Sequence, residues 1–312
     1  MARRAFLGRI GDADIRLLRV FSTVAACGGL AAAETELNIS RSTISRHISN
    51  LEERLAVRLC ERGAAGFALT QEGERVLEAA SRLLSSLNSF QSDINEIHAK
   101  MTGHLSVAMF DKSVTNPAAH LPKAIAMFNE VAPDVTLGFY GEPVNTIENG
   151  ILTGRLDMAI VPVHQKFGTL TYSKLYPEQM YLYCAAGHSL FDKPDDSVTR
   201  KDVQACNYAG IGFQSPNMLN SHKFELERKA EVYDEEALAA LVFSGRFIGF
   251  LPEHFAERFE TRGTLRKIRP DIFTYVSDHW AIVRRAPKPS RLVMTFLDCL
   301  HKAHGLSASG HR

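Results

Sequence analysis

Several features that mark secreted, membrane or metal-binding proteins are scarce in this chain. Its 312 residues include five cysteines, at positions 27, 60, 184, 206 and 299, and no C-x-x-C pair. This argues against a disulfide framework and a zinc site and favours a reducing cytoplasm. A thiol switch between Cys184 and Cys206 stays open beside the simpler interpretation of buried, inert thiols. The first fourteen residues lack the apolar core of a signal peptide, and no apolar run approaches the length of a membrane span.

A strong net charge is also missing. The 36 Lys and Arg residues against 35 Asp and Glu residues give a formal charge of +1, so the chain is no bulk polycation. The first 99 residues nevertheless contain twelve arginines and no lysine, while the remainder contains twelve of each. Arginine presents a planar fork that pairs with guanine or phosphate, so this asymmetry favours a nucleic-acid contact near the N-terminus.

Motifs for catalysis and for metal binding are absent as well. The sequence has no G-x-S-x-G, no P-loop, no dinucleotide fingerprint and no metal-ligand spacing among its twelve histidines. We therefore expect no catalytic residue, no metal and no cofactor. An enzyme or a small-molecule-binding α/β protein with an accessory DNA-binding head stays the alternative to a regulator. A pure solute-binding protein would carry a signal peptide, and an architectural DNA-binding protein would not need the long second half.

The stretch from Leu37 to Gly73 is the most informative part of what is present. Ser40 is a good helix cap, and the residues after it place an apolar side chain at helical spacing, at Ile44, Ile48, Leu51 and Leu55. The opposite face carries small hydroxyls and one arginine, namely Ser42, Arg46 and Ser49, with Ser45 at its flank. A structural surface helix would favour Glu, Lys, Gln and Ala, whereas short polar side chains suit a recognition helix in the DNA major groove.

The flanking segments complete a winged helix-turn-helix. An amphipathic helix opens near Asp14, and a short second helix runs from Leu30 to Leu37. Two short strands, 57–59 and 67–69, are joined by a tight turn at 63–66. We expect this DNA-binding domain to occupy residues 1–70.

A long helix follows, and its apolar residues repeat at alternating steps of four and three. They are Val76, Ala80, Leu83, Leu87, Phe90, Ile94, Ile97 and Met101. Such a heptad seam favours pairing with a second helix over packing on the chain's own core. A helix from 71 to 101 would be about 45 Å long. We therefore expect a linker at 71–102 and a homodimer formed through residues 76–101, which would present two recognition helices to a two-fold symmetric site.

The remainder, 103–312, alternates strands with helices, which indicates an α/β fold with a mostly parallel sheet. Three predicted strand ends run into a helix that begins with proline, at Pro117, Pro143 and Pro216. Helix N-termini beyond strand ends suit a carboxylate or phosphate. The candidate effector-binding residues at these ends are Ser113, Thr115, Asn116, Gly141, Glu142, His164, Phe213 and Gln214. Each is equally compatible with a capped turn.

The glutamate in this set constrains the ligand. Glu142 would repel a simple anion, so either the effector carries an amine as well as an acid or Glu142 points away. The expected ligand is a small organic molecule, either a carboxylate or an amino-acid-like compound.

The runs AAETELNISRSTISRHISNLEERL, RLCERG and LTQEG, with IENGILTGRLDMAI and ALAALVFSGRFIGFLP further on, resemble the LysR-type transcriptional regulators over essentially the whole length. The resemblance implies an α+β multidomain bacterial regulator. Its winged head binds double-stranded DNA, and its C-terminal domain binds an effector between two subdomains similar to periplasmic binding proteins. Subdomain I would comprise 103–163 with 268–304, and subdomain II 164–267.

Residue by residue, the family's base- and phosphate-contacting positions match Arg41, Ser42, Thr43, Ser45 and Arg46, and the arginine at the start of the wing matches Arg62. The resemblance also implies pairing through the long helix. As a mechanism, cleft closure would alter the association of dimers into a tetramer and the DNA bend, and so the access of RNA polymerase at an inverted-repeat promoter. No membrane partner is expected.

Three positions depart from the family pattern. Glu34 replaces a small residue, so the second helix either packs differently or exposes a carboxylate. Cys60 replaces a larger apolar residue beneath the wing. Ala64 and Ala65 occupy the wing tip, where relatives often place an arginine, so minor-groove readout is in doubt.

Overall fold

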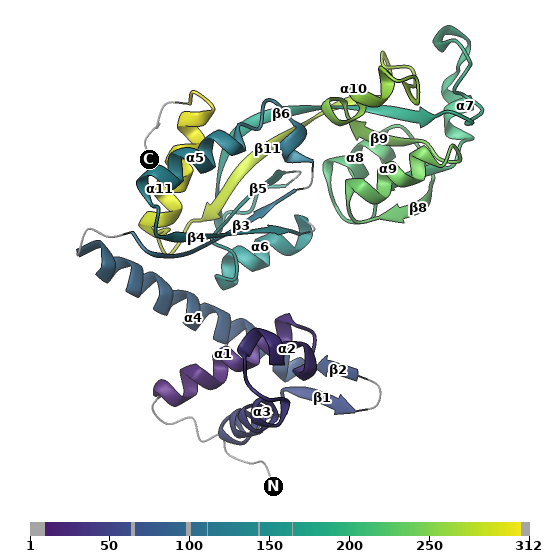
Figure 1. The fold of residues 1–312 in the computed structure, drawn as a ribbon. Helices are drawn as coiled ribbons and strands as arrows, with labels where there is room; N and C mark the ends of the chain where they lie inside the picture. Colours follow the sequence, from purple (N-terminus) through teal and green to yellow (C-terminus); the bar gives the residue numbers. More distant parts are fainter. Residues whose placement is uncertain are drawn as a thin grey trace. The chain divides into compact units, whose positions relative to one another are not determined.

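The computed structural model describes residues 10–306, apart from 64–65, 98–100, 111, 143 and 164. The chain forms two compact units, one made mainly of the residues up to Gln91 and the other of most of the remainder. Figure 1 shows both units in colours that follow the sequence.

The N-terminal unit is a winged helix-turn-helix. Its helices are α1 (Asp12–Ala26), α2 (Leu30–Leu37) and α3 (Arg41–Leu55), followed by the antiparallel strands β1 (Cys60–Gly63) and β2 (Gly66–Leu69). The predicted apolar stripe of α3 is confirmed: Ile44 and Ile48 are fully buried, and Leu51 is 2% exposed. They pack with Phe21 and Val24 of α1, so one small core orients all three helices.

The first wing strand begins later than the expected residues 57–59. Ala56 ends α3 in the left-handed conformation (φ 54°), and the backbone N–H groups of Leu59 and Cys60 donate to Glu52 Oε1 at 2.8 and 3.4 Å. These contacts hold the segment as a connector, so pairing starts only at Cys60. Cys60 itself is buried within the core of the head.

Helix α4 is described from Gln71 to Ile97; residues 98–100 lie outside the described residues, and Met101, the predicted last residue of the helix, is not helical. Met101 does not belong to the helical seam: it packs against the apolar core of the second unit, and its Sδ accepts from Thr295 Oγ1 at 3.8 Å. Within α4, Val76 packs on the head, whereas Phe90 and Ile94 are 62% and 41% exposed. The side chain of Ile97 lies outside the described residues.

Within the described ranges, no single helix is long and apolar enough to span a membrane. Helices α1 and α2 meet that measure only as a pair bent by 120°.

The second unit is built on a seven-stranded mixed sheet. The strands are β3 (Gly103–Met109), β4 (Val135–Gly141), β5 (Met158–Pro162), β6 (Leu170–Ala185), β9 (Gly249–Pro252), β10 (Leu265–Lys267) and β11 (Thr274–Arg284). They lie in the order β10-β6-β11-β5-β3-β4, with β9 also paired to β6. Only β3–β4 and β3–β5 are parallel in this sheet, so the expectation of a mostly parallel sheet is wrong.

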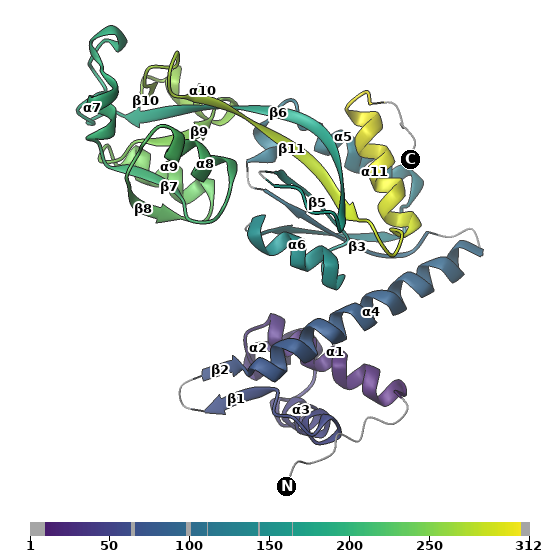
Figure 2. The ribbon, with the colours of Figure 1, turned by 180° about the vertical axis from the view of Figure 1, so that it is seen from behind.

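The reason lies in two long strands. Strands β6 and β11 run side by side in antiparallel register from Leu170↔Arg284 to Tyr181↔Thr274, and they cross from one lobe to the other (Figures 1 and 2). The first lobe, which contains β3, β4 and β5, adds η1 (Ser113–Thr115), α5 (Leu121–Val131), α6 (Val144–Thr153) and α11 (Arg291–Ala303) (Figure 1). The second lobe adds η2 (Asp195–Ser197), α7 (Arg200–Gln204), β7 (Tyr208–Ile211), α8 (Pro216–Lys223), β8 (Arg228–Val232), α9 (Glu235–Phe243) and α10 (Glu253–Glu260).

One predicted helix start is wrong. Pro117 lies in a turn after η1, because Asn116 Oδ1 accepts from the Ala118 N–H at 2.9 Å and folds the chain locally. His120 then takes a left-handed conformation, and α5 begins only at Leu121. Pro216 does open α8, capped by Ser215, whose side chain accepts from the Met218 N–H. Pro143 lies outside the described residues.

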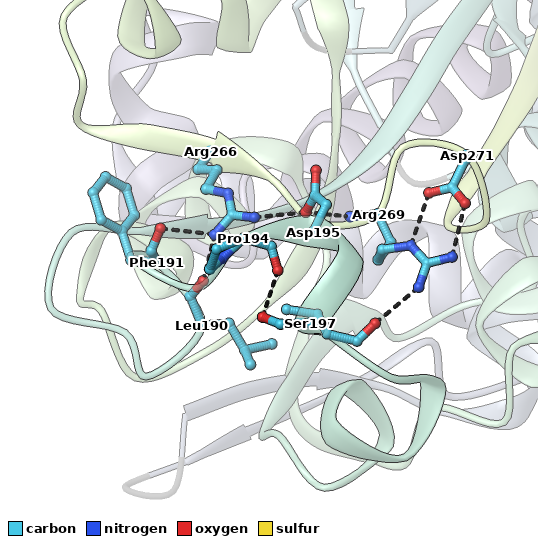
Figure 3. A network of polar contacts seen from close by, with 9 residues as sticks. Leu190, Phe191, Pro194, Asp195, Ser197, Arg266, Arg269 and Asp271 are labelled. Carbon is cyan, nitrogen blue, oxygen red and sulfur yellow. Dashed lines mark hydrogen bonds and ion pairs between the residues drawn. The ribbon is translucent and has the colours of Figure 1, made fainter.

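The far end of the second lobe is held by two arginines (Figure 3). Arg266 donates to Asp195 Oδ1 at 2.6 Å and to the Leu190 carbonyl at 2.7 Å. Arg269 forms a bidentate pair with Asp271 at 2.9 and 2.8 Å, and its backbone N–H reaches Asp195. These contacts fasten the loop before α7 to β10 and to the segment that follows it.

Candidate functional site

The outward face of α3 has the geometry that the sequence predicts. Arg41, Ser42, Arg46 and Ser49 are exposed, while Thr43 and Ser45 are half-buried at its edges. Ser40 caps the helix, and its Oγ lies 3.0 Å from Ser42 Oγ and 2.9 Å from Thr43 Oγ1. The result is a capped helix whose exposed side offers hydroxyl and guanidinium groups without a large apolar side chain.

Glu34 gives the helix a second cap. Its carboxylate accepts from the backbone N–H of Arg41, the first residue of α3, at 2.5 Å. A negative charge at a helix N-terminus is favoured by the helix dipole. The departure noted at this position therefore stabilises the recognition helix. The Arg62 side chain and the wing-tip residues Ala64 and Ala65 lie outside the described residues.

The underside of the same helix is kept in place by charge. Arg54 near its C-terminus donates from Nη2 to Asp14 Oδ2 of α1 at 2.9 Å. His47 is half-buried, and burial, reinforced by Arg16 and Arg46, lowers its pKa below the usual value. His47 is therefore neutral at pH 7, and Arg41 and Arg46 provide the positive charge of the face.

In the second unit, the loop after β3 is held by polar contacts rather than left open. Ser113 is 2% exposed, and its Oγ donates to the Phe110 carbonyl at 2.8 Å. Thr115 Oγ1 lies 3.0 Å from Nδ1 of His254, which belongs to α10 in the other lobe. Asn116 is 7% exposed and donates to Glu178 at 3.4 Å. Of these contacts, the one between Thr115 and His254 joins the two lobes, and that of Asn116 reaches the crossing strand β6.

Glu178, His254 and His279 form the centre of this junction, and sequence reasoning missed all three. Glu178 is 5% exposed on β6; its Oε1 lies 2.8 Å from His254 Nε2, and its Oε2 lies 3.9 Å from His279 Nε2. His279 is 1% exposed and stacks on Tyr176 with ring centres 4.7 Å apart. Burial lowers the pKa of His279, so the ring is neutral at pH 7.

The other candidates are more scattered. Gly141 is exposed at the end of β4, and Glu142 is half-buried beside Thr146, which donates to it at 3.2 Å. Phe213 is 5% exposed and belongs to the apolar core, so it packs rather than facing a cavity. Gln214 is exposed and lines a cavity. His164 lies outside the described residues.

Three hollows lie near these residues. One, about 210 Å³, is bounded by α6, the end of β5 and Gln214. A second, about 280 Å³, lies between α8 and β11. A third, about 20 Å³, is lined by Glu178, Ser215 and Glu235 at the lobe junction. No cluster of three or more metal-ligating side chains occurs in the described part of the chain.

Comparison with known proteins agrees with this architecture. Residues 15–74 match the model of the bacterial regulatory helix-turn-helix protein, lysR family, and residues 98–305 match the LysR substrate binding domain. The chain is 36% identical over 299 residues to the HTH-type transcriptional activator BauR of Pseudomonas aeruginosa, covering 96% of this chain and 98% of that one. It is 25% identical to the regulator GltR of Bacillus subtilis, over 85% and 88% of the two chains.

The fold is also that of solved full-length regulators. The LysR family regulator CbnR superposes with a TM-score of 0.62 at 21% identity, over 93% of this chain and 99% of that one. A full-length OxyR variant from Pseudomonas aeruginosa gives 0.62 at 17% identity, over 98% and 100%.

The winged head, the two-lobed α/β domain and these matches define a regulator with a DNA-binding head and an effector-binding domain. The chain belongs to the LysR family of transcriptional regulators. Members of this family bind DNA and act as oligomers, and the relatives found are named as regulators rather than enzymes. The alternative of an enzyme with an accessory head is therefore set aside.

Proposed function

We propose that this regulator reads an inverted-repeat promoter site through the outward face of α3. Arg41, Ser42, Thr43, Ser45, Arg46 and Ser49 would contact bases and phosphates, and Arg62 would contact the backbone beside the wing. The observation that carries this proposal is the exposed, hydroxyl-rich face of α3 opposite an apolar stripe in which Ile44, Ile48 and Leu51 are buried and Leu55 is half-buried. An α-helix with short side chains fits the major groove, where base edges are distinguishable.

Two copies pair through α4 in this proposal. Phe90 and Ile94 continue the heptad spacing of Val76 and Leu83, yet they are largely exposed in the single chain. A second α4 would cover them, because a heptad seam is buried by a partner helix. The functional parts are then the head (1–70), the linker (71–102) and the effector domain (103–312). Dimers would associate into tetramers, and effector binding would change the access of RNA polymerase.

The effector in this proposal is a small carboxylate or amino-acid-like molecule at the lobe junction, and the regulator works in the cytoplasm. The α8 N-terminus, with Ser215 and Pro216, supports the acidic part, because helix N-termini favour anions. Glu178 and Glu235 line the same hollow and would face the amine of an amino-acid-like effector. A regulator with the same fold, LysG of Corynebacterium glutamicum, is known with the effector Arg bound. It has a TM-score of 0.52 and 16% identity to this chain.

The Arg46→Ala variant tests the proposed DNA contact. If Arg46 pairs with a base, the loss should be about 1–3 kcal/mol on the cognate duplex and much smaller on a scrambled one. The measurement is fluorescence anisotropy with a labelled duplex from the protein's own upstream region. Arg262→Ala, an equal loss of charge at an exposed residue of the effector domain, serves as the control. Equal weakening on both duplexes would instead identify Arg46 as a phosphate contact.

The effector part is tested on the same duplex with and without candidate carboxylates and amino acids. We expect one class of compound to shift the mobility or the footprint of the wild-type complex. If none of them does so while each is shown by calorimetry to bind the protein, the proposed coupling is wrong.

A further inference from the structure

A lysine occupies an aromatic site beside two of the hollows. Lys166 places its Nζ 3.5 Å from the ring centre of Trp280 and 5.7 Å from that of Tyr172. Trp280 is the only tryptophan of the chain. An ammonium group over aromatic faces is attracted by their negative π-surface, and such rings are the usual receptor for alkylammonium ligands.

The loop that carries Lys166 is held over this site. The backbone N–H of Phe167 donates to Tyr172 Oη at 3.0 Å, which ties the loop to the start of β6. Lys166 itself is exposed, so its ammonium group stays over the rings without being enclosed. A contact of this kind breaks readily, because an exposed cation–π contact is weak.

The loop also separates two hollows. Val163 and Gln165 line both the hollow of about 210 Å³ on the α6 side and the hollow of about 280 Å³ on the α8 side. Tyr172 lines the first and Trp280 the second, so the Lys166 ammonium stands between the two. If the Lys166 side chain moved away, the two hollows would form one continuous site with the rings of Tyr172 and Trp280 at its middle.

The walls favour a cation with a short apolar body. The α6 side is lined mainly by aliphatic groups: Val144, Ile147, Val161, Leu170 and Ile282. Its carboxylate is Glu148, which forms no ion pair with any residue of the described ranges. Burial raises the pKa of Glu148, and a hydrogen bond with Thr169 partly offsets this rise. On the other side, Asp278 is already paired with Lys174 at 2.6 Å.

We propose that this is a binding site for a small alkylammonium group, and that Lys166 occupies it as a built-in competitor. The ligand's ammonium would take the place of Nζ over Trp280 and Tyr172, with its apolar body toward α6 and Glu148 nearby. The hollow on the α6 side, which would hold the apolar body, is about 210 Å³ and so smaller than the roughly 300–1,000 Å³ of drug-sized ligand pockets, which favours a ligand with a short body. The regulatory consequence rests on the proposed effector role of this domain, whereas the site itself does not.

The probe is n-butylammonium, because it reproduces the end of the lysine side chain. Its binding is followed by Trp280 fluorescence in the full-length protein, in which that signal has a single source. Lys166→Met removes the internal cation while keeping an unbranched side chain. We expect the variant to bind n-butylammonium about 2- to 30-fold more tightly than the wild type, the range set by releasing one cation–π contact.

Three comparisons make the result decisive. Neutral n-pentanol should bind the Lys166→Met variant clearly less well than n-butylammonium. Glu148→Gln in that background should weaken the cation by up to about fivefold. Lys288→Met, which removes an exposed lysine that lines neither hollow, should leave the affinity at the wild-type value. Circular dichroism confirms that each variant is folded.

The proposal is overturned if folded Lys166→Met binds n-butylammonium no more tightly than the wild type, or if n-pentanol binds equally well. The ammonium site and the proposed function can be tested independently of each other. Ammonium binding without any change in the DNA mobility shift would support the site and argue against an effector role for it. Effector-dependent shifts in a protein that does not bind the ammonium probe would overturn this inference alone.

Discussion

Replacing Glu178 by leucine should weaken the second unit strongly, because this carboxylate serves donors from both lobes. His254 of α10 lies 2.8 Å from Oε1, and Asn116 beside η1 donates to the same oxygen at 3.4 Å. Glu178 is 5% exposed and the His254 side chain 10%, so water cannot readily replace the lost acceptor. A buried donor left unsatisfied costs about 1–3 kcal/mol. For two donors, Glu178→Leu is expected to lower the free energy of unfolding by about 2–6 kcal/mol.

The assay is urea unfolding followed by the fluorescence of Trp280, which reports on the second unit because no other tryptophan is present. Glu178→Gln keeps one acceptor oxygen and should recover part of the loss. Asp278→Leu is the matched control: it also removes a carboxylate beside the crossing strands, but its pair with Lys174 is 33% and 52% exposed. An exposed pair contributes about 0–1 kcal/mol. Equal destabilisation by the two leucine variants would refute the reasoning.

Two further outcomes follow from the structure. Burial and the neighbouring His120 lower the pKa of His304 to about 4 in the folded protein. Between about pH 6.5 and pH 4 the unfolded chain therefore binds more protons than the folded one, so the free energy of unfolding falls as the pH drops. His304→Phe, which keeps a ring on Tyr176, should flatten this decline in urea titrations at several pH values, and an unchanged slope would contradict the assignment. Leu83→Asp should convert the dimer to a monomer in sedimentation equilibrium by charging the α4 seam, and a persistent dimer would place the interface elsewhere.

The head could be predicted almost completely because its determinants are local. Ser40 as a cap and Ile44, Ile48 and Leu51 as a buried stripe lie within one helix, where sequence spacing fixes which side chains share a face. The start of the first wing strand was harder to predict from the sequence. It depends on Glu52 reaching the backbone of Leu59 across the helix end, a contact that no periodicity reveals.

The sheet of the second unit was harder to predict because its pairing is long-range. Strand β6 pairs with β11 about one hundred residues later, and the antiparallel direction is set by that partner rather than by the strand's own residues. The strand–helix alternation therefore suggested a parallel sheet. The predicted helix start at Pro117 is wrong because proline is common both at the first position of a helix and in turns. Here Asn116 Oδ1 accepts from the Ala118 N–H and stabilises the turn.

In the candidate effector site, too, the local features could be predicted and the long-range contacts could not. Ser113, Thr115 and Asn116 could be found because they follow a strand end, and the contacts of Thr115 and Asn116 place these two at the lobe junction. Their partners Glu178 and His254 were missed, since they are separated by 76 residues and carry no motif. Phe213 is predicted to face the cleft but packs in the core, in the same buried cluster as Val232 and Leu238, which lie at least nineteen residues away in the sequence.

The most direct test of the central claim is a hydroxyl-radical footprint of the wild-type protein on its own upstream duplex. If two α3 helices dock in successive major grooves, the protected regions should form two symmetry-related half-sites about one helical turn apart, or a multiple of it. Arg46→Ala should lose this pattern at concentrations where Arg262→Ala retains it. Uniform protection that is the same on a scrambled duplex, and unchanged by Arg46→Ala, would contradict the account.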